Sequence, residues 1–190
     1  MITWRRVTGN DFPLLRHWLA QPHVARWWNH DTPGARNPSE DLVVLLDAAR
    51  GPGPAVPVRR LTPHTLGVVY VGVRSGGTSW PPVTEVADET MTLDYLIGDA
   101  EQVGRGHGPR MIRALVRATW RDHPYAPAVL IPVPLANRAS WRALEKAGLC
   151  RVAEGELEPD SPAAGRAHYV YRATRPTRPR AADAARPGSG

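Results

Sequence analysis

The alternation of apolar and polar positions divides this chain into short strands and helices. A period of two, or a short continuous apolar run, marks strands at residues 2–7, 56–60, 66–73, 89–97, 128–133, 149–155 and 168–173. Helical spacing marks residues 11–20, a short turn at 24–28, and residues 39–50, 109–122 and 137–147. This order predicts one α/β domain in which the helix after the fourth strand crosses over to the fifth.

Each predicted helix has one apolar face. In the first, Asp11 is expected to cap the N-terminus, and the buried face comprises Leu14, Leu15, Trp18 and Leu19. In residues 109–122 an apolar stripe lies opposite a row of four arginines. The stripe comprises Met111, Ile112, Leu115, Val116 and Trp120, and the row comprises Arg110, Arg113, Arg117 and Arg121.

A glycine-rich loop, residues 103–108, joins the fourth strand to this helix. Its three glycines let the backbone approach an anion, and the following helix adds the positive end of its dipole. Pro109 suits the first helical turn, where a missing N–H costs nothing. The loop lacks both the Gly-Lys-Ser/Thr of a P-loop and the distant acid of a dinucleotide fingerprint. The loop is therefore a candidate phosphate site, and a plain turn is the alternative.

Composition excludes several classes of protein. The single cysteine, Cys150, rules out an intramolecular disulfide and is expected to be a small core residue rather than a nucleophile. Apolar runs are too short to span a membrane, and the first residues lack the order of a signal peptide. The seven histidines form no metal-ligand spacing, so no metal is expected. These features predict a cytoplasmic protein.

The net charge of +6 does not by itself indicate a nucleic-acid partner. Residues 174–190 hold about half of it and are rich in Pro, Arg and Ala, which predicts a disordered tail after a domain spanning residues 1–173. Aromatic side chains do not alternate with arginines as an RNA-binding surface requires. No nucleic-acid or membrane partner is expected, and a nucleic acid bound by the arginine-rich tail is the alternative.

Carboxylates are concentrated where basic residues are missing. No Lys or Arg stands between Arg74 and Arg105, where six acids fall, and a second acidic run covers residues 154–160. This pattern indicates a small acceptor with several positive charges, and solvated surface acids are the alternative. Asp94 is singled out because a strand position between Leu93 and Tyr95 is a costly place for an unused carboxylate.

A second motif supports the first. Asn137 opens a helix that ends in Glu145-Lys146-Ala147-Gly148 and turns into a strand. Together with the glycine loop, this motif resembles the GCN5-related N-acetyltransferase (GNAT) family. The resemblance implies a mixed, mostly antiparallel sheet of about seven strands with flanking helices, and acetyl-CoA as cofactor. The implied cofactor-binding residues are Leu96, Ile97, Gln102, Val103, Gly104, Arg105, Gly106, His107, Gly108 and Asn137.

A narrower resemblance links the chain to the aminoglycoside 6'-N-acetyltransferases. It is carried by Trp18-Leu19, residues 23–28, residues 92–98 and Glu158-Pro159-Asp160. It implies that Asp94 is the base or orients the amine, and that the cationic acceptor is bound by Trp27, Trp28, Glu89, Asp94 and Asp160. Polyamine or siderophore-hydroxylysine acyltransferases, and a non-catalytic CoA-binding protein, remain alternatives. A monomer or a homodimer is expected.

Two residues depart from the pattern of these relatives. In many relatives a tyrosine precedes Glu-Lys, and that tyrosine is proposed to protonate the departing thiolate. This chain has Leu144 at that position. Pro132 stands where relatives carry an acid after the fifth strand. The general acid is therefore Tyr95, a water molecule or no residue at all.

Overall fold

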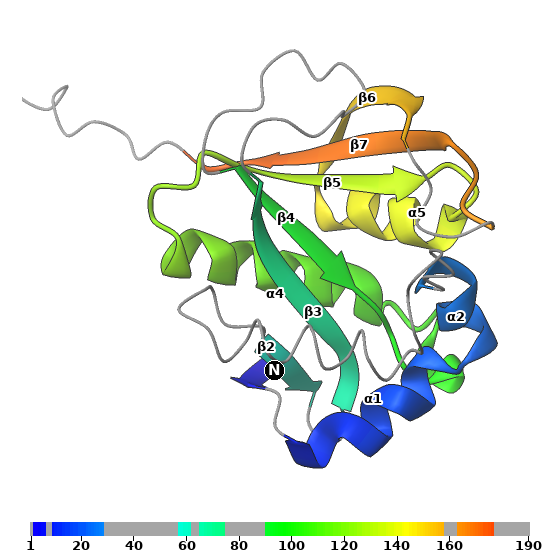
Figure 1. Ribbon diagram of the computed structural model, residues 1–190. Coiled ribbons are helices and arrows are strands. Elements are labelled where there is room, and N and C mark those ends of the chain that lie inside the picture. Colours follow the sequence, from blue (N-terminus) through cyan, green and yellow to red (C-terminus); the bar gives the residue numbers. More distant parts are fainter. Residues whose placement is uncertain are drawn as a thin grey trace, which may run out of the picture.

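A single mixed sheet organises the protein. The computed structural model describes residues 2–6, 9–28, 57–61, 65–74, 90–157 and 163–176 (Figure 1). Seven strands follow the order β1 (Ile2–Arg6), β2 (Pro57–Leu61), β3 (Thr65–Arg74), β4 (Thr90–Tyr95), β5 (Ala128–Pro134), β7 (Ala167–Thr174) and β6 (Cys150–Glu156). Neighbours are antiparallel except β4 and β5, which are parallel. The α/β class and the mixed, mostly antiparallel sheet are confirmed.

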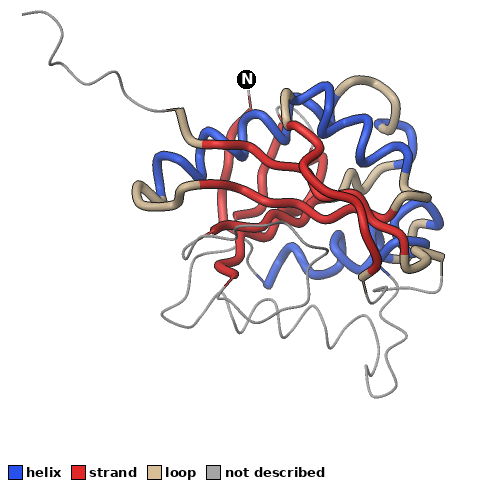
Figure 2. The backbone as a smooth tube through the Cα atoms, turned by 90° about the horizontal axis from the view of Figure 1, so that it is seen from above, coloured by secondary structure: helices blue, strands red, loops and turns tan. Residues whose placement is uncertain are grey.

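Helices lie on both sides of the strands (Figure 2). Near the N-terminus of the chain, η1 (Gly9–Asp11) leads into α1 (Phe12–Leu19) and α2 (Pro22–Trp28). A short helix, η2 (Ala100–Gln102), precedes α4 (His107–Asp122), which crosses over to β5 as predicted, and α5 (Arg138–Ala147) follows β5. The helix expected at residues 39–50 and the loop expected at residues 75–82 lie outside the described residues.

Two apolar clusters hold these helices to the sheet. The larger one packs α4 and α5 on β4, β5 and β7, and includes Met111, Ile112, Leu115, Leu144 and Tyr171. The apolar stripe predicted for α4 is therefore confirmed, and its four arginines are exposed. The smaller cluster joins α1 and α2 to the end of β4 and comprises Leu15, Trp18, Val24 and Leu96.

Several local predictions were wrong. The side chain of Asp11 makes no capping hydrogen bond to α1, and Leu14 is 37 % exposed because α1 buries only a narrow face on the sheet. The fourth strand ends at Tyr95 rather than at Ile97, since its pairing with β3 ends at Tyr95, opposite Val69. Cys150 is exposed, not a core residue, because it begins β6 at the edge of the sheet.

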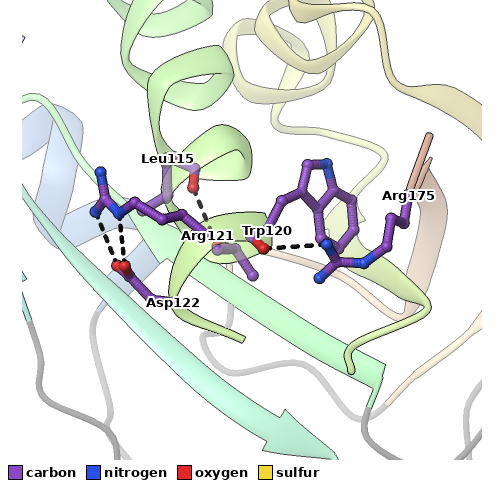
Figure 3. A network of polar contacts seen from close by, with 6 residues as sticks. Leu115, Trp120, Arg121, Asp122 and Arg175 are labelled. Carbon is purple, nitrogen blue, oxygen red and sulfur yellow. Dashed lines mark hydrogen bonds and ion pairs between the residues drawn. The ribbon is translucent and has the colours of Figure 1, made fainter. Parts of the chain in front are cut away.

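The C-terminal end of β7 is fastened to α4 by Arg175 (Figure 3). Its guanidinium donates to the carbonyls of Trp120 (3.0 Å), Ala126 (2.9 Å) and His123, and lies 4.8 Å from the centre of the Trp120 ring. These bonds satisfy carbonyls that the end of a helix leaves without partners. The folded part therefore extends at least through Arg175, two residues beyond the expected boundary, and residues 177–190 lie outside the described part.

Across the described ranges, no helix combines the length and the apolar composition needed to cross a membrane.

The contact between Gly98 and Trp18 yields a stability prediction. A Cβ at position 98 would lie 2.0 Å from Cδ2 of Trp18, so Gly98→Ala is expected to lower the free energy of unfolding by about 1–3 kcal/mol through overpacking. Urea unfolding measures the loss. Gly108→Ala is the matched control, because its Cβ would meet Ala143 at an ordinary 3.4 Å. Equal losses in both variants would contradict the packing argument.

Candidate functional site

The candidate site lies where β4 and β5 separate. Between these two strands, both fully described, a single residue pair is in register, Met91 with Val129. Beyond it the strands run apart toward their C-terminal ends (Figure 1). We call this region the β4–β5 divergence. The loop before α4 starts from the end of β4, and α5 starts just after the end of β5, so both motifs singled out in the sequence lie around it.

The glycine loop has the conformation that its sequence suggested. Gly104 and Gly106 have φ angles of 80° and 78°, in the left-handed region that favours glycine, and Gly106 caps α4. No heavy atom lies within 4 Å of a Cβ built at either position, so the backbone conformation, not space, requires glycine there. Gly108 instead lies beside Ala143 of α5 and Ile97, which brings the start of α4 to the end of β4.

Polar groups at the start of α4 fit a phosphate-containing ligand. His107 is the first residue of α4, and its Nδ1 is buried without a hydrogen-bond partner. A buried nitrogen of this kind calls for a ligand atom or a water, and at a helix N-terminus an anionic oxygen suits it best. Arg105 is exposed in the same loop, whereas Gln102 ends η2 and Val103 is 43 % exposed. The residues present therefore fit a pyrophosphate.

Asp94 lies near the outer end of β4 and is exposed. The first four residues of β4 are buried and Asp94 is the first that is not. The prediction that Asp94 occupies a costly, buried strand position was therefore wrong, because its side chain is exposed at this end of β4. Its exposure nevertheless leaves the carboxylate accessible from solvent. The residue remains a candidate on its position, not on its burial.

Tyr95 ends β4 and reaches across to α5. Its Oη lies 2.8 Å from Oγ of Ser140, and the ring is partly buried. Burial, as the largest cause, raises the pKa of Tyr95 well above its ordinary value, and the Ser140 hydrogen bond opposes that rise. The phenol therefore keeps its proton at any physiological pH. It can donate a hydrogen bond to a ligand but cannot act as a base.

The two residues after Tyr95 are held by the N-terminal helices. Leu96 is 7 % exposed and packs with Trp18 and Val24, so its side chain faces the core rather than a ligand. The carbonyl of Ile97 accepts a hydrogen bond from Nε2 of His23, at 2.8 Å. His23 belongs to residues 23–28, which carry part of the family resemblance, but no role was predicted for it. Binding of a cofactor by the amide of Leu96 stays a prediction.

Asn137 works as a helix cap. Its side chain accepts from the backbone N–H of Ser140 at 3.2 Å and so begins α5. A direct contact with cofactor stays a prediction. Leu144, about two turns further along, has no exposed surface and belongs to the main core. Pro132 lies inside β5, opposite Val170, rather than after that strand.

Most of the expected acceptor residues cannot be placed together. Trp27 is partly buried, with the Arg26 guanidinium 4.9 Å from its ring centre. The side chain of Trp28, and all of Glu89 and Asp160, lie outside the described residues.

The second acidic run is partly neutralised. Within the described chain, Glu154 pairs with Arg151 at 3.8 Å and Glu156 with Arg166 at 3.2 Å. These two carboxylates therefore offer less to a cationic acceptor than the sequence suggested. Among the described residues, no three His, Cys, Asp or Glu side chains group as metal ligands would.

Comparison with known proteins points to one family. Residues 64–157 match the family model of the acetyltransferase (GNAT) domain. Aminoglycoside N(6')-acetyltransferases type 1 from Klebsiella pneumoniae and Serratia marcescens are each 28 % identical over 165 residues, covering 85 % of this chain and 80 % of theirs.

Solved structures share the fold. A crystal structure of the aminoglycoside acetyltransferase AAC(6')-Ib with coenzyme A matches with a TM-score of 0.72 at 24 % identity, covering 92 % of this chain and 95 % of that one. An aminoglycoside N(6')-acetyltransferase from Legionella pneumophila matches with a TM-score of 0.65 at 17 % identity, covering 91 % of each chain.

The buried tyrosines predict how stability depends on pH. Tyr171 donates to Glu145, and burial, followed by this bond, raises the pKa of Tyr171 to about 12. In the unfolded chain this phenol ionises near pH 10, whereas in the folded chain it stays protonated until about pH 12. The free energy of unfolding is therefore at its full value below pH 10 and falls as the pH rises from 10 toward 12. Tyr171→Phe is expected to reduce that slope by up to about 1.4 kcal/mol per pH unit in chemical unfolding. Tyr125→Phe, which removes an 83 % exposed phenol, should leave the slope unchanged.

Proposed function

We propose that this chain, a member of the GNAT acetyltransferase family, transfers the acetyl group of acetyl-CoA to the 6'-amine of an aminoglycoside. The observation that carries the proposal is the end of β4. There an exposed carboxylate, Asp94, and a protonated phenol, Tyr95, follow each other along the strand at the β4–β5 divergence, with side chains on opposite faces of the sheet. The anion-binding loop begins within ten residues of them. Base, hydrogen-bond donor and phosphate site thus share one edge of the sheet.

Residues 103–108 and the start of α4 hold the cofactor. Their amides, the helix dipole and the unpartnered Nδ1 of His107 bind the pyrophosphate. Acetyl-CoA supplies an acetyl group already activated as a thioester. On the side facing β5, the outer residues of β4 are not in register with that strand, so backbone groups there can hold the pantetheine arm and orient the carbonyl.

Asp94 prepares the acceptor. An ammonium group has no free electron pair, so it must lose a proton before its nitrogen can form the new bond to the acetyl carbon. The Asp94 carboxylate accepts that proton, directly or through a water, and orients the amine. General-base help of this kind contributes about 10²–10⁴-fold to a rate. The carbon–sulfur bond then breaks, and its electron pair stays on sulfur.

Tyr95 assists the departure of that sulfur. Its phenol remains protonated, so it donates a hydrogen bond to the developing negative charge. Leu144, at the position where relatives often carry a tyrosine, is buried and has no proton to give. In this chain the phenol therefore comes from the strand rather than from α5.

Charge selects the acceptor. Asp94, Asp99 and Glu101 are all exposed along the segment that leaves β4, and no basic residue lies between Arg74 and Arg105. A polycation is attracted to such a segment while the nearby glycine loop binds a polyanion. The sequence similarity to aminoglycoside N(6')-acetyltransferases favours an aminoglycoside over a polyamine. The single cysteine fits a reducing compartment, which agrees with action in the cytoplasm.

Replacing the base tests the mechanism. Asp94→Asn keeps the size of the side chain but accepts a proton poorly, so kcat with kanamycin is expected to fall about 10²–10⁴-fold, with the KM for acetyl-CoA near the wild-type value. Thiol release from acetyl-CoA measures both constants. Asp122→Asn, which removes a carboxylate paired with Arg121 at the far end of α4, is the matched control. Wild-type turnover by Asp94→Asn would remove this residue from the mechanism.

Acceptor chemistry tests the substrate class. Kanamycin and tobramycin, which carry a 6'-amine, are expected to be acetylated, and an aminoglycoside with a hydroxyl at the same position is not. Mass spectrometry of the product locates the acetyl group. Turnover only with spermidine or a hydroxylamine would reject the aminoglycoside and leave the acetyl-transfer chemistry in place.

A further inference from the structure

One hydrogen bond links two elements that the β4–β5 divergence separates. Tyr95 ends β4, and Ser140 lies in the first turn of α5, 45 positions later in the chain. Their hydroxyl oxygens are 2.8 Å apart. Because β4 and β5 are in register only at Met91 and Val129, this side-chain bond joins the two sides again beyond the point where the backbones part. It fixes the Tyr95 hydroxyl at the same end of the sheet as the anion-binding loop.

Ser140 itself is well fixed. Its backbone N–H donates both to the carbonyl of Asn137 and to the Asn137 side chain, at 3.1 and 3.2 Å. It therefore belongs to the capped first turn of α5, and that helix packs on the main core through Leu144. Because the first turn of α5 is fixed in this way, the Ser140 hydroxyl can hold the Tyr95 hydroxyl at the end of β4 in one position.

Either hydroxyl can be the donor in the Tyr95–Ser140 bond. Each hydroxyl has one proton to donate. Burial makes ionisation of Tyr95 unfavourable, so its phenol keeps that proton. In one of the two arrangements Ser140 donates to the phenol oxygen, which would also oppose the rise in the pKa of Tyr95. The proton of Tyr95 is then free to face a ligand in the divergence.

We propose that Ser140 is a positioning residue: it donates to Oη of Tyr95 and holds the phenol so that its proton points at the sulfur of bound acetyl-CoA. The proposal rests on the proposed acetyl transfer. Ser140 contacts no substrate and acts only through Tyr95. Its removal should therefore affect the reaction only while the phenol is present, which separates positioning from a general loss of structure.

A double-variant cycle measures this dependence. Ser140→Ala is expected to lower kcat about five-fold, the equivalent of one hydrogen bond, and Tyr95→Phe about 10²-fold, with acetyl-CoA affinity unchanged in both. In the Tyr95→Phe background, Ser140→Ala should cause no further loss. Ser140→Thr keeps the hydroxyl and should restore activity. Tyr171→Phe is the control, because it removes a buried phenol that bonds Glu145 of the same helix but lies outside the site.

A second readout needs no acceptor. Carbon-13 at Cζ reports the hydrogen bonding of each of the five tyrosines, and the Tyr95 signal is assigned by its loss in Tyr95→Phe. We expect this signal to shift in Ser140→Ala, to return in Ser140→Thr, and to shift again when CoA binds the wild type. If these shifts appear and no aminoglycoside is acetylated, the proposed acceptor fails while the positioning role stands.

Three results would overturn the proposal. The first is a Ser140→Ala enzyme with wild-type kcat. The second is an equal further loss when Ser140→Ala is added to Tyr95→Phe, which would show that the serine acts independently of the phenol. The third is a Tyr95 signal that responds neither to Ser140→Ala nor to CoA.

Discussion

The separation of β4 from β5 is the constraint on which the site depends. Each strand has a full antiparallel partner on its other side, β3 for β4 and β7 for β5, so the sheet survives although the two strands are in register at one pair only. Backbone groups at the outer end of β4 therefore remain without β5 as a partner. Buried or half-buried backbone groups seek hydrogen bonds, and here a ligand can supply them. A binding edge arises inside a sheet rather than at its border.

The end of β4 must be held in place for this edge to be useful. On one side, Trp18 packs against the backbone of Gly98, and His23 binds the carbonyl of Ile97. On the other side, Ser140 binds the hydroxyl of Tyr95. Two separate apolar clusters, one under α1 and α2 and one under α4 and α5, thus fix four consecutive residues, 95 to 98, from opposite directions. The flanking position of Asp94 is fixed as a consequence.

In the proposed reaction, two substrates of opposite charge would meet at this edge. In that proposal, the loop at residues 103–108 and the start of α4 would attract phosphates, and the carboxylates on the segment just before it would attract ammonium groups. These two regions are separated by only a few residues along the chain, from Glu101 to Gly104. This short separation between the two regions suits a direct transfer of the acetyl group, because the acetyl donor and the amine must be bound at the same time.

Local sequence determined most of the elements and the conformation of the glycine loop. Glycines at 104 and 106, the cap at Asn137, the turn at Gly148 and the apolar stripe of α4 each act within a few residues, and all have the conformation that was predicted. Tertiary structure decided the rest, because burial and pairing depend on segments far apart in the chain. The exposure of Cys150 follows from the edge position of β6, and the core position of Leu96 and the links Tyr95–Ser140 and His23–Ile97 join segments far apart in the chain. No periodicity in a single segment encodes where two strands part.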